Sequence, residues 1–476
     1  MTDSDSDRDL VFTPVLELRR LIASGELSPV ELTEAVLRRI GSLNPAVNSF
    51  LTVCEESALR TAREAETALS RGESWGPLHG LPVGIKDLYE TEAVRTTYGS
   101  LLYKDHISEA DGILASRLKA AGAILVGKTN TPEFGSAFST ENLLGEPCRN
   151  PWNLEMSSGG SSGGAAAGVA AGMCPVCPGS DGGGSIRVPA SLCGLFGLKP
   201  TYGRIPYDVH PVHGAGLDFI CHGPISRTVK DAAFLLATVG GADPRDYAAL
   251  QTPLPDYVRA LEEPSGPLRI AWSADLGYAS PDDEVVTTIE QTLEVVEDLG
   301  HNVEVASLQF DPPFGTWEEL ASAANHVVFA GMLEKHGDQL TPYFRRSLEI
   351  GAELDGDDII SGWMDVVRWR GRLSQLLADY DLLITPTVAQ SSFPVDVAAP
   401  ERPLGHGMMY WQVAPFTAIF NFTQNPAATV PCGIASSGLP IGMQIVGRLR
   451  DEVTVLKLAA EIEEARPWVH RRPAIC

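Results

Sequence analysis

The side chains of this chain whose types and spacing best suit catalysis are serines in two glycine-rich segments. The first segment, residues 159–164, carries Ser161 and Ser162, and the second, residues 180–185, ends at Ser185. A serine hydroxyl becomes an effective nucleophile when a neighbouring base takes its proton. Lys86 lies in an apolar segment of the chain, and burial of a lysine lowers its pKa enough to make it such a base.

Three consecutive glycines, Gly182, Gly183 and Gly184, directly precede Ser185. Glycine lets successive backbone N–H groups turn toward one point, which is what an oxyanion hole requires. The pattern therefore predicts a serine nucleophile beside an oxyanion hole. A histidine base stays open as an alternative, because any of the 10 histidines could fold onto this loop.

A nucleophile elbow is another interpretation of the first glycine-rich segment, since residues 159–163 and 160–164 both fit G-x-S-x-G. That motif needs an apolar strand directly before it, and residues 150–158, NPWNLEMSS, predict a poor strand. Residues 165–172 are Ala, Val and Gly and predict a helix that is buried on every side. We therefore favour two serine-bearing loops held in a fixed relation by a buried helix.

The composition narrows the classes of partner. The chain has 476 residues, a net charge of -25 and a pI near 4.8, so we expect it to repel nucleic acid and anionic membranes. No apolar run is long enough for a membrane helix, and the acidic N-terminus does not resemble a signal peptide. These features predict a cytoplasmic protein whose 8 cysteines are free thiols.

A C-x-x-C pair, Cys174 and Cys177, is the spacing of a zinc half-site or a redox pair. The chain offers no second cysteine pair with that spacing, and His210, His213 and His222 do not complete a familiar zinc pattern. We therefore expect buried structural thiols and no metal site. The histidine segment is a candidate for the substrate entrance.

Helix and strand patterns alternate along the chain, which indicates an α/β fold with helices on both faces of a sheet. The fold that we predict is a single large α/β/α domain, residues 10–476, with a mixed, mostly parallel central sheet. Residues 1–9 predict a disordered acidic tail. Residues 240–400 are rich in helix patterns and predict a variable cap.

Several segments of the chain resemble one known family. The stretch from Gly159 to Arg204 resembles the signature of the amidase signature family. Further segments that resemble it cover nearly the whole chain: GLPVGIKD around Lys86, GKTNTPEF at 127–134, RNPWN at 149–153, DLLITPT at 381–387 and LPIGMQIVG at 439–447.

The resemblance implies a Ser–cis-Ser–Lys triad. It places the nucleophile at Ser185, the bridging serine at Ser161 after a cis peptide bond, and the base at Lys86. It also implies that backbone N–H groups near Gly182, Gly183, Gly184 and Ser185 bind the oxyanion. The remaining expected roles are a supporting hydrogen bond from Ser162, buried loop partners in Asp181 and Arg187, and an acyl pocket lined by Gly135, Ser136, Ala137 and Phe138.

The activity that the resemblance implies is hydrolysis of a small or medium carboxylic amide, without a metal or organic cofactor and with a homodimer as the family-level expectation. The alternative is the glutamine-hydrolysing A-type subunit of a tRNA-dependent amidotransferase. That component carries an aspartate in a D-x-F-T context, where this chain has Ala414 in VAPFT. A catalytically dead binding protein is a third hypothesis, which the intact triad disfavours.

Overall fold

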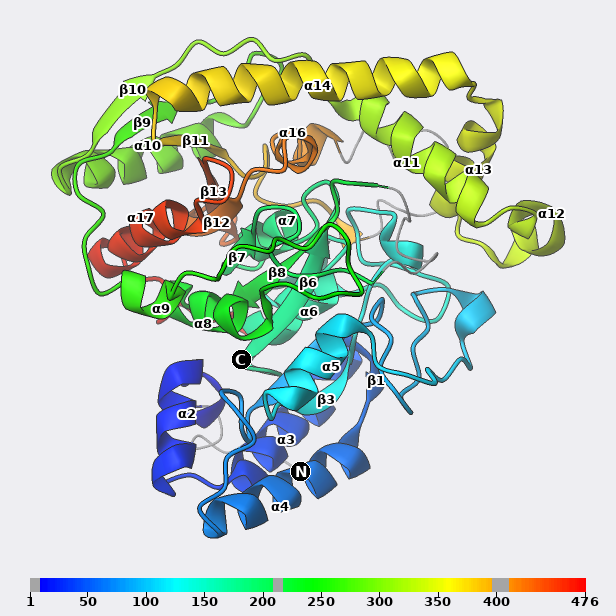
Figure 1. Ribbon diagram of the computed structural model, residues 1–476, viewed down its shortest axis with the longest axis vertical. Coiled ribbons are helices and arrows are strands. Elements are labelled where there is room, and N and C mark those ends of the chain that lie inside the picture. Colours follow the sequence, from blue (N-terminus) through cyan, green and yellow to red (C-terminus); the bar gives the residue numbers. More distant parts are fainter. Residues whose placement is uncertain (1–8, 209–216, 396–410) are drawn as a thin grey trace.

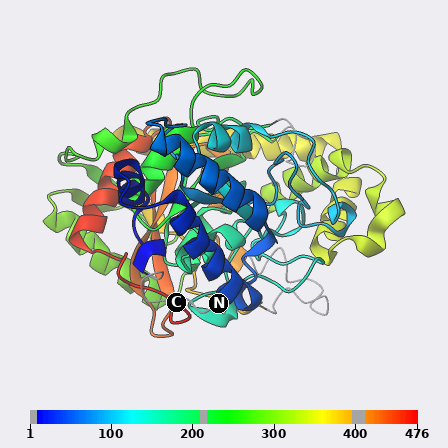
Figure 2. The same cartoon turned by 90° about the horizontal axis from the view of Figure 1, so that it is seen from below.

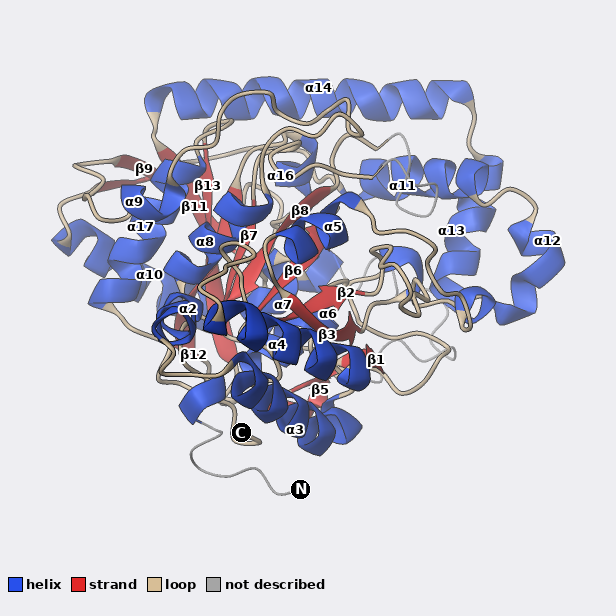
Figure 3. Cartoon of the chain, turned by 60° about the horizontal axis from the view of Figure 1, so that its bottom comes forward, coloured by secondary structure: helices blue, strands red, loops and turns tan. Residues whose placement is uncertain are grey.

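Two helical layers enclose a central sheet in the computed structural model of the chain (Figure 3), which describes residues 9–208, 217–395 and 411–476. The predicted tail lies outside the described residues except for Asp9, whose backbone is helical. In the described part of the chain, no helix combines the length and apolar character needed to cross a membrane.

The large sheet has eight strands in the order β10-β9-β11-β13-β12-β7-β8-β6. In chain order their bounds are β6 Val176–Asp181, β7 Phe196–Lys199, β8 Cys221–Ser226, β9 Arg269–Trp272, β10 Asn302–Val305, β11 Leu382–Pro386, β12 Ala427–Ile434 and β13 Pro440–Gly447. The sheet is mixed, as predicted, but "mostly parallel" is wrong. Only β9 pairs in parallel, with β10 and β11, and the other five pairings are antiparallel.

A second sheet of three strands, in the order β1-β3-β2, lies beside β6. Its strands are β1 Phe50–Val53, β2 Pro82–Lys86 and β3 Ile124–Thr129. Close contact between β2 and β6 depends on Gly84, where a side-chain Cβ would lie 2.8 Å from the Cys177 sulfur. This approach brings the end of β2, with Lys86, against the end of β6.

Burial on both faces holds the large sheet between its helices. In β11, Leu382 and Ile384 belong to the same apolar core as helices α10 and α17, whereas Leu383 belongs to the core formed with α14 and α16. The alternation is the period of two that a strand imposes on its side chains. These helices are α10 Asp283–Asp298, α14 Gly356–Asp379, α16 Ala418–Phe422 and α17 Glu452–Ala465.

The N-terminal helices α2 Val15–Ser24, α3 Pro29–Val47 and α4 Glu55–Ser70 cover one side of the molecule (Figure 2). The start of α3 follows its sequence signals, because Ser28 caps the backbone N–H groups of Val30 and Glu31 and proline occupies the first turn. The other helices between the strands are α5 Ile113–Ala120, α8 Val229–Val239 and α9 Tyr257–Ala260, with short 3₁₀ turns at Leu101–Tyr103, Glu133–Gly135 and Gly337–Gln339.

The region predicted as a cap, residues 240–400, is divided in the structure. Its strands β9, β10 and β11 belong to the large sheet. The helices of this region are α9 and α10, which pack near the sheet, and α11 Phe314–Val328, α12 Met332–His336, α13 Pro342–Glu353 and α14. Helices α11–α13 project at one end of the molecule and α14 runs along its edge (Figure 1). The sequence predicts short strands at 269–272, 303–307 and 382–384, close to β9, β10 and β11, but not their membership of the large sheet.

The glycine-rich stretch contributes two short helices, α6 Gly163–Ala170 and α7 Arg187–Leu192, on either side of β6. Every residue of α6 is buried, as predicted for the helix between the two glycine-rich segments. Residues 153–157 form a strand, β5 Asn153–Ser157, where a poor strand was expected. It pairs with the two-residue strand β4 Arg149–Asn150 and forms an isolated bridge to Pro394. It does not belong to the large sheet, whereas a nucleophile elbow needs a strand of that sheet.

Candidate active site

Lys86 is buried at the end of β2, and three serine hydroxyls surround its amine. Its Nζ lies 2.7 Å from Oγ of Ser161, 3.0 Å from Oγ of Ser162 and 2.9 Å from Oγ of Ser180. Desolvation lowers the pKa of Lys86 well below its ordinary value of 10.5, and the negative charge of Asp181 opposes that shift without cancelling it. The amine is therefore suited to accept a proton at neutral pH.

Hydrogen-bond directions around Lys86 leave its lone pair for Ser161. The Ser162 hydroxyl donates to the backbone carbonyl of Ser180 at 3.1 Å, and the Ser180 oxygen lies within hydrogen-bond distance of Nζ as an acceptor. Both oxygens are then free to accept the two N–H groups of a neutral amine. The supporting role expected of Ser162 is consistent with this contact, and Ser180 is a further member of the group that the sequence analysis missed.

Ser161 is 2% exposed and follows a cis peptide bond between Gly160 and Ser161, which is the geometry that the resemblance implies. Gly160 packs so closely against the loop of residues 137–139 that a Cβ there would lie 2.8 to 2.9 Å from the loop backbone. Only glycine fits this contact, and the contact brings the predicted acyl-pocket loop to the bridging serine.

Ser185 is 7% exposed and lies in the loop between β6 and α7. The two serine loops touch through the backbone, because the N–H of Ser162 donates to the carbonyl of Ser185 at 3.1 Å. Ser161 and Ser185 both line the same cavity. The structure thus brings together the three residues of the expected triad from β2, the start of α6 and the loop before α7.

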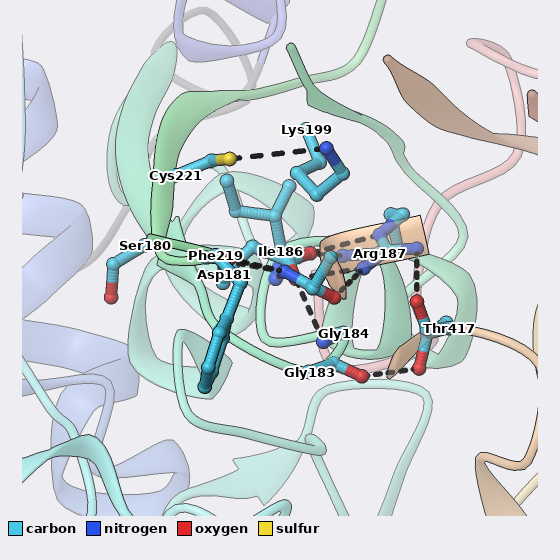
Figure 4. A network of polar contacts seen from close by, with 12 residues as sticks. Ser180, Asp181, Gly183, Gly184, Ile186, Arg187, Lys199, Phe219, Cys221 and Thr417 are labelled. Carbon is cyan, nitrogen blue, oxygen red and sulfur yellow. Dashed lines mark hydrogen bonds and ion pairs between the residues drawn. The ribbon is translucent and has the colours of Figure 1, made fainter. Parts of the chain in front are cut away.

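Asp181 and Arg187 form a fully buried ion pair that fixes the shape of this loop (Figure 4). Nε and Nη2 of Arg187 donate to the carboxylate at 2.9 and 2.8 Å, and the amide of Asn421 donates at 2.9 Å. Burial alone raises the pKa of Asp181, but the Arg187 charge and these hydrogen bonds outweigh it and hold the pKa at about 2. The other nitrogen of Arg187 donates to Gln444 and to the carbonyl of Thr417.

The predicted oxyanion hole needs one correction. The N–H of Gly184 donates to the Asp181 carboxylate at 2.7 Å, so it is not available to a substrate oxygen. Within the described residues, the N–H groups of Gly182, Gly183 and Ser185 have no acceptor in the protein, and these three residues line the cavity. The oxyanion hole that the geometry allows is therefore Gly182, Gly183 and Ser185.

Carbonyl groups of the same loop are also held. The indole Nε1 of Trp317 donates to Gly182 O at 2.8 Å, and the Thr417 hydroxyl donates to Gly183 O at 2.5 Å. Sequence reasoning missed Trp317, Thr417, Asn421 and Gln444. Gln444 lies within the segment LPIGMQIVG, which resembles the family and could have identified it. The sequence around Trp317 carries no comparable motif.

The cavity beside Ser185 has a volume of about 880 Å³. All four residues of the predicted acyl-pocket loop, Gly135 to Phe138, line it. Most of its other walls are apolar or aromatic, and the charged side chains that reach it include Glu318 and Arg346, which are exposed. His222 also lines the cavity, where Tyr207 stacks on it; His210 and His213 lie outside the described residues.

The cysteine pair is buried, as expected. Cys174 and Cys177 are buried with their sulfurs 3.0 Å apart, and all eight cysteines are free. Among the described residues, no group of three or more His, Cys, Asp or Glu side chains has the arrangement of a metal site.

Comparison with known proteins agrees with this geometry. The sequence model of the family described as Amidase matches residues 31–456. An acylamidase from Rhodococcus erythropolis is 36% identical to the chain, with 98% of each sequence covered. The chain belongs to the amidase signature family.

Two other relatives bear on the activity of this amidase. The A-type component of a glutamyl-tRNA(Gln) amidotransferase from Roseiflexus sp. (strain RS-1) is 37% identical, covering 96% of this chain and 97% of its own. The solved structure of 6-aminohexanoate cyclic dimer hydrolase, complexed with substrate, superposes with a TM-score of 0.89 at 30% identity and covers 98% of this chain and 99% of its own. This amidase therefore shares the whole fold of these enzymes, and hydrolysis of amides is its chemistry.

Proposed function

We propose that this amidase hydrolyses an uncharged linear carboxylic amide through an acyl-enzyme on Ser185. The observation that carries the proposal is the buried contact of 2.7 Å between Lys86 Nζ and Ser161 Oγ, beside a cavity that both loop serines line. A neutral lysine, a bridging hydroxyl and a nucleophilic hydroxyl together form the proton path that serine needs.

In the first half of the reaction, neutral Lys86 takes the proton of Ser161 while Ser161 takes the proton of Ser185. Ser185 Oγ bonds to the amide carbon, and the carbonyl oxygen becomes an oxyanion that accepts hydrogen bonds from the loop N–H groups. When the C–N bond breaks, Ser161 gives its proton to the leaving nitrogen and recovers one from protonated Lys86. The products of this half are the free amine or ammonia and the acyl-enzyme.

In the second half, a water molecule replaces the amine. Ser161, again with Lys86 as the final acceptor, takes a proton from the water as its oxygen bonds to the acyl carbon. Collapse of the second oxyanion breaks the bond to Ser185, whose oxygen receives the proton back through Ser161. The carboxylic acid leaves, and the triad returns to its starting protonation without any cofactor.

Apolar cavity walls support an uncharged acyl or amine group of moderate size. The name of one relative, an acylamidase, agrees with this class. The glutaminase alternative has support in the 37% identity to the A-type component of an amidotransferase. However, Ala414 is buried in an apolar cluster with Phe138, Val413 and Trp411, so that position offers no carboxylate for the charged groups of free glutamine.

A fluorophosphonate probe followed by peptide mapping tests the nucleophile. We expect the probe to modify Ser185, and we expect Ser185→Ala and Lys86→Ala each to lower amide turnover by at least about 10³-fold. The matched control is Ser191→Ala, because Ser191 is a buried serine of α7 that does not line the cavity. Labelling of Ser161 or full turnover in either variant would refute the assignment.

Release of ammonia from glutamine tests the alternative. Turnover of glutamine faster than of simple amides would favour the role in an amidotransferase complex. A cytoplasmic location, a homodimer and the absence of nucleic-acid partners stay predictions from the sequence, which cell fractionation and light scattering can test.

A further inference from the structure

Trp317 joins the wall of the cavity to the loop that carries Ser185. It lies in the first turn of α11, is half-buried and lines the cavity. Its ring centroid lies 6.3 Å from that of Phe138 and 5.4 Å from that of Trp411, and Phe314 stacks on Trp411 at 4.9 Å. We call these four side chains, Phe138, Phe314, Trp317 and Trp411, the aromatic wall.

The indole N–H of Trp317 is directed away from the wall, to the carbonyl of Gly182 at 2.8 Å. That carbonyl and the N–H of Gly183 belong to one planar trans peptide and point in opposite directions. A hydrogen bond to the carbonyl therefore fixes the direction of the Gly183 N–H, one of the three oxyanion donors. The close approach depends on glycine, because a Cβ on Gly183 would lie 3.0 Å from the indole nitrogen.

The next peptide, between Gly183 and Gly184, is held at both of its polar groups by buried side chains. Thr417 donates to the carbonyl of Gly183, and the N–H of Gly184 on the same peptide donates to Asp181 (Figure 4). Both of these partners are fully buried, so the second peptide is fixed whether or not a substrate is present. The first peptide instead depends on a half-exposed side chain whose ring faces the substrate cavity.

We propose that Trp317 is a positioning residue that couples occupation of the aromatic wall to the alignment of the Gly183 N–H. A substrate with an aromatic or bulky apolar group packs against the wall, excludes water from the indole and stabilises its bond to Gly182 O. The binding energy of that remote group is then used to align the oxyanion hole. This amidase accordingly selects aromatic or bulky apolar amides through kcat as well as through KM. The inference rests on the proposed attack by Ser185.

Propionamide and 3-phenylpropionamide are suitable probes, since they differ by one phenyl group and both release ammonia. We expect the wild-type enzyme to turn over 3-phenylpropionamide with the higher kcat. Trp317→Phe keeps an aromatic ring but removes the N–H. It should lower kcat for 3-phenylpropionamide about tenfold or more, change KM less than about threefold, and reduce the difference in kcat between the two amides.

Trp411→Phe is the matched control, because it alters the same wall without touching the Gly182 carbonyl. We expect it to raise KM for 3-phenylpropionamide and to lower kcat much less than Trp317→Phe does, since the N–H that bonds to Gly182 is still present. Replacement of Trp317 by 3-benzothienylalanine, which has a sulfur in place of the indole N–H and nearly the same shape, keeps the test available if the phenylalanine variant does not fold. It should reproduce the loss of kcat.

The rate of Ser185 labelling by a fluorophosphonate gives a second readout, since the attack on phosphorus also builds negative charge on an oxygen in the hole. It should fall by a factor similar to that for kcat, at an unchanged melting temperature. A raised KM with unchanged kcat in Trp317→Phe would overturn the proposal and show that Trp317 only contributes to substrate binding as part of the aromatic wall. Equal kcat values for the two amides in the wild type would also overturn it. Absence of both labelling and ammonia release in the wild type would instead refute the function proposed above.

Discussion

In the proposed mechanism, Lys86 is the residue on which the chemistry depends most directly. A lysine buried without a carboxylate in contact is a poor cation, because desolvation penalises the charged form. Its three hydroxyl neighbours can stabilise a neutral amine, and the nearest of them leads to the nucleophile. The charge of Asp181 raises the pKa of Lys86, in opposition to desolvation. The Asp181 carboxylate forms its ion pair with Arg187 and not with Lys86.

The protonation of Lys86 predicts how activity depends on pH. Its pKa in the folded enzyme is lowered by burial, so the amine is neutral above that value and becomes cationic as pH falls through it. A cation cannot accept the proton of Ser161, and kcat should therefore fall at low pH with the slope of a single ionisation. Steady-state kinetics across the range in which the fold is stable would measure this. A kcat that stays constant down to the pH at which the fold is lost would count against the lysine base.

The sequence allowed roles to be proposed for Lys86, Ser161 and Ser185 because each lies in a local segment that resembles the family, and the structure brings the three segments together. The Gly184 assignment was wrong since a triplet of glycines does not show which N–H groups turn inward, and Asp181 takes one of them. Trp317 could not be assigned because its contact with Gly182 spans 135 positions and follows only from how α11 packs on the loop.

At the scale of elements, the loop between β6 and α7 is shaped by a charged pair rather than by apolar packing. Asp181 ends β6 and Arg187 begins α7, so the pair closes the loop across its base. Asn421, from α16, donates to the same carboxylate and accepts from Arg187 at 2.6 Å. The nucleophile loop is thereby tied to a helix more than two hundred residues away in sequence.

Removal of either Asp181 or Arg187 should lower the free energy of unfolding by much more than the net stabilisation that the intact ion pair contributes. Arg187→Met leaves Asp181 buried without its cation, and we expect the free energy of unfolding to fall by about 3–5 kcal/mol. Urea denaturation monitored by tryptophan fluorescence would measure the change. Asp181→Asn added to that variant should restore part of the stability, because it removes the unpaired charge. A double-mutant cycle with no coupling between the two positions would contradict this account.

In the whole molecule, the presence of helices on both faces of the sheet was predictable from the sequence. The order and direction in which the strands pair were not. Alternating patterns along the chain identify strands and helices locally, whereas parallel or antiparallel pairing depends on where distant strands meet. The antiparallel pair β12 and β13 is joined by a short turn at 435–439, but β7 and β12 pair across more than two hundred residues. The sequence carries no local signal for such a neighbour.

Helices α11–α13 are attached to the sheet domain through Glu133 and Tyr343. The buried carboxylate of Glu133 accepts from Ser100 Oγ and from both N and Oγ1 of Thr341, at 2.6 to 2.7 Å. The hydroxyl of Tyr343, in the first turn of α13, accepts from the N–H of Glu133 at 2.6 Å and donates to the carbonyl of Glu141 at 2.9 Å. These bonds hold the helical wall of the cavity against the acyl-pocket loop.

Tyr343→Phe should therefore loosen this attachment without unfolding the sheet. Loss of a partner for a buried N–H costs about 1–3 kcal/mol, so hydrogen exchange in peptides from α13 should accelerate about 5- to 100-fold. Tyr380→Phe is the matched control, because its hydroxyl bonds to Glu304 at the far end of α14. We expect kcat/KM to fall in Tyr343→Phe alone, since a displaced α13 widens the cavity. Faster exchange throughout β12 and β13 would show instead that α11–α13 unfold together with the sheet.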